Sequence, residues 1–246
     1  MEQELNRIIE NTKKAQQVFL DTQTENPIPL MSSKEKLNDE KPKRDHYYSI
    51  NGIPMKYKTC TLDEFQGGDV YVEAIRKLSD SIENMVLIGK TGSGKTHLAI
   101  GVLKIIDVNK IPRCSRSYKS DTWDEPPEKY FITLPEVLLR IRDSFKSNPR
   151  ESEADVVNYF SDIDCLVLDD LGAEKPSEFS VATLYLILDR RINNCRQTII
   201  TTNLEMQEIE QIFGARIASR LSEMKIIKIN MPDYRKKRGA KSTTTS

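Results

Sequence analysis

Residues 89–96 have the types and the spacing of a phosphate-binding loop. They read Gly-Lys-Thr-Gly-Ser-Gly-Lys-Thr and match G-x-x-x-x-G-K-[ST] at every fixed position. The glycines let backbone N–H groups approach a phosphate without obstruction by Cβ atoms, and a helix that begins here adds a partial positive charge. In such a loop Lys95 reaches the β- and γ-phosphates, and the hydroxyl of Thr96 is a ligand for Mg²⁺. The pattern therefore predicts a site for a nucleotide with Mg²⁺.

The surroundings of this loop fit the same interpretation. The apolar run 85–88 has the length of a buried strand, and an apolar run compatible with a helix covers residues 98–106. The alternative is an ordinary glycine-rich turn before a helix, which the complete motif in this context disfavours. We expect the nucleotide to contact the loop and the histidine after it: Gly89, Lys90, Thr91, Gly92, Ser93, Gly94, Lys95, Thr96 and His97.

Two carboxylates, Asp169 and Asp170, follow the apolar run Leu166-Val167-Leu168. Asp169 fits the carboxylate that holds Mg²⁺ together with Thr96. Asp170 should point in a different direction, where it could polarise an attacking water. The alternative is an Asp-rich turn at the end of a strand, which is common.

Asn203 ends a third strand-like run, Thr-Ile-Ile-Thr-Thr at 198–202. Its amide could donate a hydrogen bond to the γ-phosphate or orient the attacking water. The alternative is that Asn203 caps a helix that starts near Glu205.

Apolar patterns place these residues in an alternation of strands and helices. We expect strands at 85–88, 130–133, 165–168, 197–202 and 225–230, and helices at 70–78, 98–106, 134–145, 155–160, 178–193, 206–212 and 216–221. Such alternation specifies an α/β fold with a mainly parallel sheet. Ligands bind at the carboxyl ends of the strands in these sheets, so Gly89, Asp169 and Asn203 should converge on one nucleotide.

The N-terminal part of the chain differs in composition from the rest. Residues 1–25 place apolar side chains at mostly helical spacing, which predicts an amphipathic helical arm that binds a partner. Residues 26–49 are charged, contain three prolines and read as a linker. We expect the main domain at 50–235, and a basic, disordered tail at 236–246.

Composition limits the partners and the location of the protein. The 246 residues include 37 basic and 37 acidic side chains, so any nucleic-acid surface must be local. There is no apolar signal region at the N-terminus and no run of 18 apolar residues, so we expect a cytoplasmic protein without a membrane partner. The four cysteines are far apart in sequence, which disfavours a zinc site.

Four motifs in order carry a resemblance to a known family. They are Gly-Lys-Thr-Gly-Ser-Gly-Lys-Thr-His-Leu-Ala, Leu-Val-Leu-Asp-Asp-Leu-Gly-Ala-Glu, Thr-Ile-Ile-Thr-Thr-Asn-Leu and Arg-Ile-Ala-Ser-Arg-Leu. Together they resemble the AAA+ ATPases of the DnaC/DnaI helicase-loader and IstB group over residues 50–235. The resemblance implies a P-loop AAA+ (ASCE) domain with parallel strand order 5-1-4-3-2 that lacks most of the helical lid. It also implies ATP hydrolysis in a homo-oligomer whose ATP sites lie between subunits.

The resemblance also assigns roles to particular residues. Lys95 acts in catalysis as well as in binding, Asp170 belongs to the Walker B motif with Asp169, and Asn203 matches sensor 1. Arg220 matches the arginine finger that reaches the γ-phosphate of a neighbouring subunit, and Arg216 shares that interface. Arg235 resembles the sensor 2 arginine that contacts the nucleotide.

A path for single-stranded DNA needs cations along the backbone and aromatic side chains that stack on bases. Residues 134–146 offer Arg140, Phe145 and Lys146. The resemblance places Ser177 and Phe179 on the same path. The alternative is plain helix surface, with Phe145 and Phe179 in the core.

We expect an ATP-dependent loader of a hexameric, DnaB-type replicative DNA helicase onto single-stranded DNA. The close alternative is an IstB-like transposition helper ATPase that binds duplex DNA. From other classes, a small-molecule P-loop kinase and a nucleotide-switched adaptor without hydrolysis remain open. A GTPase is disfavoured, because the Asn-Lys-Ile-Pro run at 109–112 lacks the Asp expected for guanine.

Overall fold

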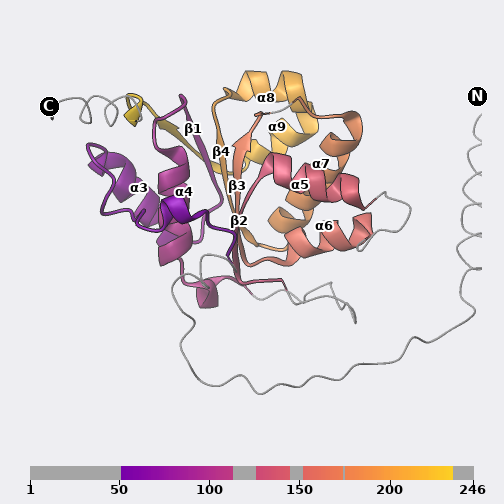
Figure 1. The fold of residues 1–246 in the computed structure, drawn as a ribbon, viewed down its shortest axis with the longest axis horizontal. Coiled ribbons are helices and arrows are strands. Elements are labelled where there is room, and N and C mark those ends of the chain that lie inside the picture. Colours follow the sequence, from indigo (N-terminus) through magenta and orange to yellow (C-terminus); the bar gives the residue numbers. More distant parts are fainter. Residues whose placement is uncertain (1–50, 113–125, 145–151, 174, 235–246) are drawn as a thin grey trace, which may run out of the picture. The chain divides into compact units, whose positions relative to one another are not determined.

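The computed structural model describes residues 51–112, 126–144, 152–173 and 175–234 (Figure 1). The sequence predictions for the arm at 1–25, the linker at 26–49 and the tail at 236–246 lie outside these ranges. Within the described residues, no helix has the length and apolar character needed to cross a membrane.

Five parallel strands build one sheet in the order β2-β3-β4-β1-β5. This is the predicted order 5-1-4-3-2 seen from the other edge. Every residue of β4 is buried, as are the first four residues of β1, because both are central strands with covered faces. The strands are β1 Met85–Gly89, β2 Lys129–Thr133, β3 Cys165–Leu171, β4 Gln197–Thr202 and β5 Lys225–Ile229.

Helices cover both faces of the sheet, which gives three layers (Figure 1). The described helices are α3 Asp69–Asp80, α4 Lys95–Ile105, α5 Leu134–Asp143, α6 Glu153–Asp162, α7 Glu178–Asn193, α8 Met206–Phe213 and α9 Ala215–Ser222, with short 3₁₀ turns at Met55–Tyr57 and Val108–Lys110. Side chains alternate between the faces of β1: Met85 and Leu87 pack with α3 and α4, whereas Val86 and Ile88 pack with the helices from α5 to α9. The α/β fold predicted from the sequence is therefore confirmed.

Most predicted elements lie within two residues of the observed ones, and the differences have local causes. The helix expected at 155–160 runs from 153 to 162, because Ser152 caps it: the Asp155 N–H donates to the Ser152 hydroxyl at 3.2 Å. The helix expected at 134–145 ends at Asp143. The strand expected at 165–168 continues to Leu171 and includes both aspartates.

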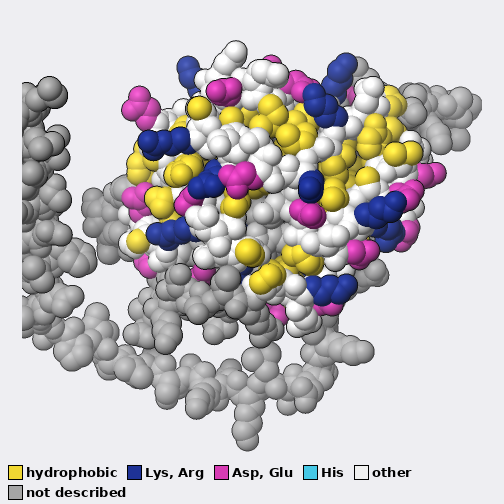
Figure 2. Space-filling view, turned by 180° about the vertical axis from the view of Figure 1, so that it is seen from behind, with side chains coloured by type: hydrophobic (Ala, Val, Ile, Leu, Met, Phe, Trp, Pro, Cys, Tyr) yellow, Lys and Arg dark blue, Asp and Glu magenta, His cyan; other side chains and the backbone are white. Residues whose placement is uncertain are grey.

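Charges of both signs are spread over the surface seen from behind in Figure 2, and basic side chains do not form one continuous patch in that view. This agrees with the balanced composition. Any nucleic-acid contact on that face therefore depends on a few local cations.

Two helices end in a strained backbone conformation. At the end of α3 the N–H groups of Ile82 and Glu83 donate to the carbonyls of Ser79 and Leu78, and Ile82 has φ 56°. At the end of α7 the N–H groups of residues 195 and 196 donate to the carbonyls of residues 192 and 191, and Cys195 has φ 52°. Both ends are Schellman motifs, in which glycine is the usual residue at the left-handed position.

Cys195→Gly should stabilise the protein by about 1 kcal/mol, because left-handed backbone costs a residue with a Cβ about that much. The Cys195 side chain is exposed, so its removal sacrifices no core packing. The melting temperature should rise by about 2–4 °C.

Cys195→Ala is the matched control, since alanine removes the thiol and keeps the Cβ. An equal rise in melting temperature for the alanine variant would show that backbone strain is not the cause.

Candidate nucleotide-binding site

The phosphate-binding loop connects β1 to α4. Gly92 and Gly94 have φ values of 79° and 93°, which favour glycine. Gly94 also lies against the ring of Phe65, and a Cβ atom at position 94 would stand 2.5 Å from that ring. Glycine is thus required here both by backbone conformation and by the close approach of Phe65.

Lys95 begins α4 and points back into the loop. Its side chain is 6% exposed, and its Nζ donates to the carbonyls of Gly89 at 2.7 Å and Lys90 at 3.1 Å. The ammonium group is therefore held inside the curve of the loop. A phosphate that binds to the loop N–H groups would meet this cation.

Asp169 joins three elements at the end of the sheet. Thr96 on α4 donates to its Oδ1 at 3.0 Å, and Thr201 on β4 donates to the same oxygen at 2.6 Å. The carboxylate is 3% exposed. Burial raises the pKa of Asp169 and the nearby Asp170 adds to this, whereas the hydrogen bonds from Thr201 and Thr96 lower it.

The chemistry of this donor set fits Mg²⁺. The Asp169 carboxylate and the Thr96 hydroxyl are hard oxygen ligands, which Mg²⁺ prefers. A divalent cation would also compensate the charge of the buried carboxylate. Thr96 and Asp169 thus lie within hydrogen-bond distance of one another, and their shared role toward Mg²⁺ stays a prediction.

Asp170 sits on an irregularity of β3. The register between β3 and β4 shifts between Leu168 and Leu171, and Asp170 has φ 58°. Its N–H donates to the Thr201 hydroxyl at 3.0 Å, and its side chain is exposed. The bulge therefore turns the Asp170 carboxylate to the surface while Asp169 stays buried. A strained residue at the end of a strand is a common feature of functional sites.

Thr201 is a site residue that the sequence reasoning missed. Its hydroxyl bonds to the Asp169 carboxylate and accepts from Asp170, although the residue lies in a fully buried strand. The next residue, Thr202, donates to the Leu171 carbonyl at 2.7 Å. Buried hydroxyls need partners, so the two threonines that follow Ile199 and Ile200 in this predicted strand were the available signal.

Asn203 is the first residue beyond β4, and its side chain is exposed. Ile88 of β1 is paired with Thr202, so Asn203 follows β4 at the level where Gly89 ends β1. The strand ends that carry Gly89, Asp169 and Asn203 therefore lie together on the side of the sheet where the carboxyl ends of the strands are found. The alternative that Asn203 caps α8 is wrong, because Glu205 is the N-cap and shares a capping box with Glu208.

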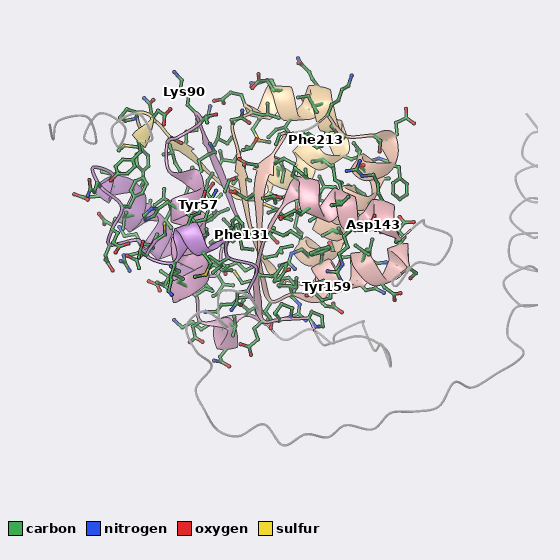
Figure 3. All side chains as sticks on the ribbon, viewed as in Figure 1. Tyr57, Lys90, Phe131, Asp143, Tyr159 and Phe213 are labelled. Atoms are coloured by element: carbon green, nitrogen blue, oxygen red, sulfur yellow. The ribbon has the colours of Figure 1, made fainter. Side chains whose placement is uncertain are left out.

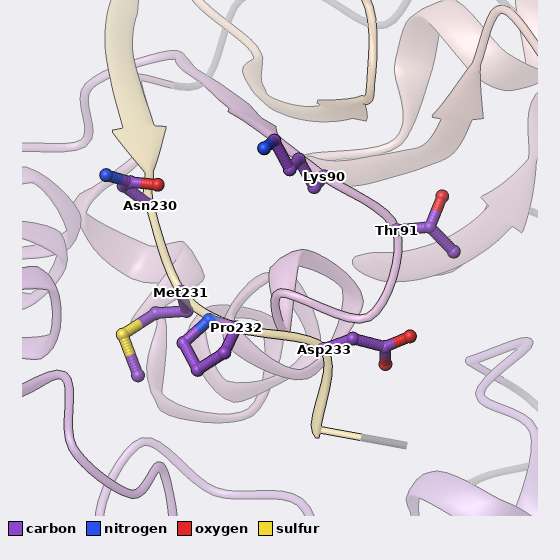
Figure 4. A pocket seen from close by; sticks show the side chains of 6 residues that line it. All are labelled: Lys90, Thr91, Asn230, Met231, Pro232 and Asp233. Atoms are coloured by element: carbon purple, nitrogen blue, oxygen red, sulfur yellow. The ribbon is translucent and has the colours of Figure 1, made fainter. Parts of the chain in front are cut away.

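The segment after β5 packs on the phosphate-binding loop. The N–H of Tyr234 donates to the Gly92 carbonyl at 3.0 Å, and a side chain at Gly92 would collide with the Asp233 carboxylate. A pocket of about 560 Å³ lies between the segment and the loop (Figure 4). Its lining residues are Lys90, Thr91, Asn230, Met231, Pro232 and Asp233. Arg235 lies outside the described residues.

The His97 side chain contacts the segment that contains Thr61 and Phe65. Its Nε2 lies 2.7 Å from the Thr61 carbonyl oxygen, and its ring meets the edge of Phe65 with the centroids 5.6 Å apart. A carbonyl can only accept, so this nitrogen carries the proton. The contact fixes residues 61–65 against α4, beside the loop.

Arg220 lies on α9 and forms two ion pairs. It binds the Asp189 carboxylate of α7, and its Nη1 donates to Glu223 at 2.8 Å. The hydrogen bond with Glu223 raises the pKa of the Arg220 guanidinium above its usual value, so it stays charged. Arg216, one turn earlier, is exposed.

Three of the expected DNA contacts fall within the described residues. Ser177 caps α7 and accepts from the Ser180 N–H at 3.2 Å, and Phe179 is 39% exposed. The alternative that places Phe179 in the core is therefore wrong. Arg140 stacks on the ring of Tyr159 at 4.2 Å. Phe145 and Lys146 lie outside the described residues.

In Figure 3, Lys90 lies near the top of the domain and Tyr159 lies below it and to the right, so the contact of Arg140 with Tyr159 is separated from the phosphate-binding loop. A single DNA strand that contacted both Arg140 and the phosphate-binding loop would have to cross the domain.

The sheet order and the glycine-rich loop with Lys95, Thr96 and Asp169 resemble those of P-loop domains of the AAA+ class. The chain is 26% identical to the replicative helicase loader DnaC of Escherichia coli K12 in an alignment of 187 residues that covers 73% of this chain and 69% of that protein. No family model matches the chain.

Solved structures share the fold. A crystal structure of the DnaC helicase loader superposes with a TM-score of 0.57 at 22% identity, over 73% of this chain and 100% of that one. The replication initiator DnaA bound to AMPPCP and single-stranded DNA superposes with a TM-score of 0.54 at 18% identity, over 76% of this chain and 56% of that one. The resemblance to the DnaC/DnaI group, seen first in the motifs, is thus confirmed.

Asp169→Asn should make the protein more stable in the absence of nucleotide. The folded-state pKa of Asp169 is raised, so the ionised carboxylate opposes folding at neutral pH. This cost is complete above the folded-state pKa and vanishes below the ordinary value of 3.8. The melting temperature should rise by about 2–4 °C for each kcal/mol gained. The further rise that ATP with Mg²⁺ gives the unaltered protein should be lost.

Asp170→Asn is the control for this prediction. Its side chain is exposed and asparagine tolerates the same backbone, so stability without nucleotide should change by less than about 0.5 kcal/mol. A lower melting temperature for Asp169→Asn without nucleotide would contradict the argument from burial.

Proposed function

We propose that the protein is an ATP-dependent loader of a hexameric, DnaB-type replicative helicase onto single-stranded DNA. The observation that carries the proposal is the meeting of Lys95, Thr96 and Asp169 at one edge of the sheet. The similarity to the replicative helicase loader DnaC supports the choice of loader over other AAA+ functions.

Each residue of the site has a chemical task in this proposal. The N–H groups of the loop bind the phosphates, and Lys95 exchanges its two carbonyl partners for phosphate oxygens. Thr96 and Asp169 hold Mg²⁺, which neutralises charge on the β- and γ-phosphates when it is bound. Asp170, exposed at the bulge, orients the attacking water, and Asn203 contacts the γ-phosphate from the neighbouring strand end.

Hydrolysis depends on a second copy of the chain. Arg220 lies on the surface of α9 and acts on the nucleotide of a neighbouring subunit, where its charge stabilises the transition state. Its two carboxylate partners lie within its own subunit. Assembly of the homo-oligomer therefore couples ATP turnover to the arrangement of subunits around DNA.

The helicase binds to the arm at 1–25 in this proposal. The arm carries apolar residues at helical spacing and is joined to the domain by a charged linker, which suits helix-in-groove binding to a separate protein. Single-stranded DNA contacts the start of α7, where Phe179 presents an exposed aromatic ring.

Lys95→Ala should abolish the ATP-dependent rise in melting temperature, because phosphate charge is left uncompensated. Arg220→Ala should keep that rise and lose hydrolysis by about 10³-fold or more. A mixture of the two variants should recover part of the turnover, because some sites combine an intact loop with an intact arginine. Turnover by each variant and by the mixture is measured with released phosphate.

The mixture is made under conditions in which subunits exchange, and each variant alone is the control. Absence of recovery would contradict the role of Arg220 between subunits. Unchanged ATP affinity and turnover in Lys95→Ala would contradict the nucleotide site itself.

Ile8→Asp with Phe19→Asp should remove most of the affinity for a DnaB-type helicase, because each large apolar side chain contributes about 1.5–3 kcal/mol when buried. The melting temperature of the domain should be nearly unchanged. Both are measured on the full chain, by helicase pull-down and by thermal melting.

Gln3→Asp with Gln17→Asp is the matched control, because it adds the same charge to the opposite face of the expected helix. A fall in melting temperature with helicase binding intact would assign the arm to the domain core. Capture of a transposase in place of the helicase would favour the IstB-like alternative.

A further inference from the structure

Arg220 lies at the surface, yet its guanidinium is held by more contacts than an exposed arginine usually makes. Its side chain is 26% exposed, and its two terminal nitrogens each contact a different carboxylate. Asp189 comes from α7, and Glu223 follows α9 directly, so the guanidinium is held by two separate parts of the chain. Two contacts in different directions fix the plane of a guanidinium.

Asp189 is itself held in place from both sides. Asn193 donates to its Oδ2 at 3.1 Å, and the hydroxyl of Tyr185 lies 3.5 Å from its Oδ1. Both partners are four residues away on α7, so they lie on the same face of the helix. Glu223 is 45% exposed and Asp189 is 27% exposed. Of the two carboxylates that contact Arg220, Asp189 is thus the more buried, and it is held by hydrogen bonds within α7.

These contacts matter because the long side chain of Arg220 is proposed to reach a phosphate bound by another subunit. An arginine held by one or two hydrogen bonds retains other N–H donors, because the guanidinium has five. It can therefore bind a phosphate oxygen without leaving Asp189. A side chain that is already oriented loses less freedom when the transition state forms, which favours the reaction.

We propose that Asp189 is a positioning residue for Arg220. It holds the guanidinium in the direction that reaches the γ-phosphate bound by a neighbouring subunit, and Tyr185 and Asn193 fix Asp189 for this purpose. The proposal rests on the function of Arg220 between subunits set out above. Residues that orient the ligands of a metal typically contribute about 10–100-fold to activity, and we expect a positioning residue for Arg220 to contribute to a similar degree.

Asp189→Ala should therefore lower kcat for ATP hydrolysis by about 10–100-fold. KM and the ATP-dependent rise in melting temperature should stay unchanged, because the phosphate-binding loop of the same subunit is intact. Asp189→Asn keeps an oxygen that accepts from Arg220 and loses the charge, so its kcat should fall less. Glu210→Ala, which removes an exposed carboxylate on α8, is the control for the change in net charge and should hydrolyse normally.

Mixing experiments separate positioning of Arg220 from damage to the fold. A mixture of Asp189→Ala with Lys95→Ala should recover turnover, because the first variant supplies an intact loop and the second an intact Arg220. A mixture of Asp189→Ala with Arg220→Ala should not recover, because both lack a positioned arginine. The reverse pattern would show that Asp189 supports its own nucleotide site, and it would overturn the proposal.

Two further outcomes are decisive. A normal or increased kcat in Asp189→Ala, with hydrolysis lost in Arg220→Ala, would overturn the positioning role and leave the role of Arg220 intact. Full hydrolysis in Arg220→Ala would overturn the role of Arg220 in the proposed function. Melting curves of each variant without nucleotide show whether it is folded, and Asp189→Asn preserves the test if the alanine variant is not.

Discussion

The buried carboxylate of Asp169 is the interaction on which the rest of the site depends. Its hydrogen bonds to Thr96 and Thr201 tie the helix after the phosphate-binding loop to two central strands. A charge in this environment is unfavourable unless it has partners. Thr96 and Thr201 are such partners, and in the function that we propose, Mg²⁺ bound with the nucleotide would offset the charge of this carboxylate.

Local patterns in the sequence were sufficient to predict the α/β class of the fold. The apolar run that became β1 is continuous because both faces of this strand are covered, and the glycine motif identifies the first loop without reference to other residues. The order of the strands came from the resemblance to AAA+ proteins, since the alternation of strands and helices does not specify it. The edge of the sheet at which Gly89, Asp169 and Asn203 meet then follows from parallel pairing.

The sequence could not predict contacts that depend on tertiary geometry. The bulge that separates Asp169 from Asp170 could not be predicted from residue type, because aspartate tolerates positive φ better than most residues but occupies ordinary backbone conformations far more often. The left-handed residues at the ends of α3 and α7 could not be predicted either, because isoleucine and cysteine occupy positions where glycine is expected. The pairing of Asp189 with Arg220 joins residues 31 positions apart on two helices.

The hydrogen bond from the Tyr234 N–H to the Gly92 carbonyl connects the segment after β5 directly to the phosphate-binding loop. Tension applied beyond Tyr234, by a bound protein or by a fused tag, would be transmitted along the backbone to the residues that cradle phosphate. The position of the segment after β5 and the shape of the phosphate-binding loop are therefore linked through one backbone hydrogen bond.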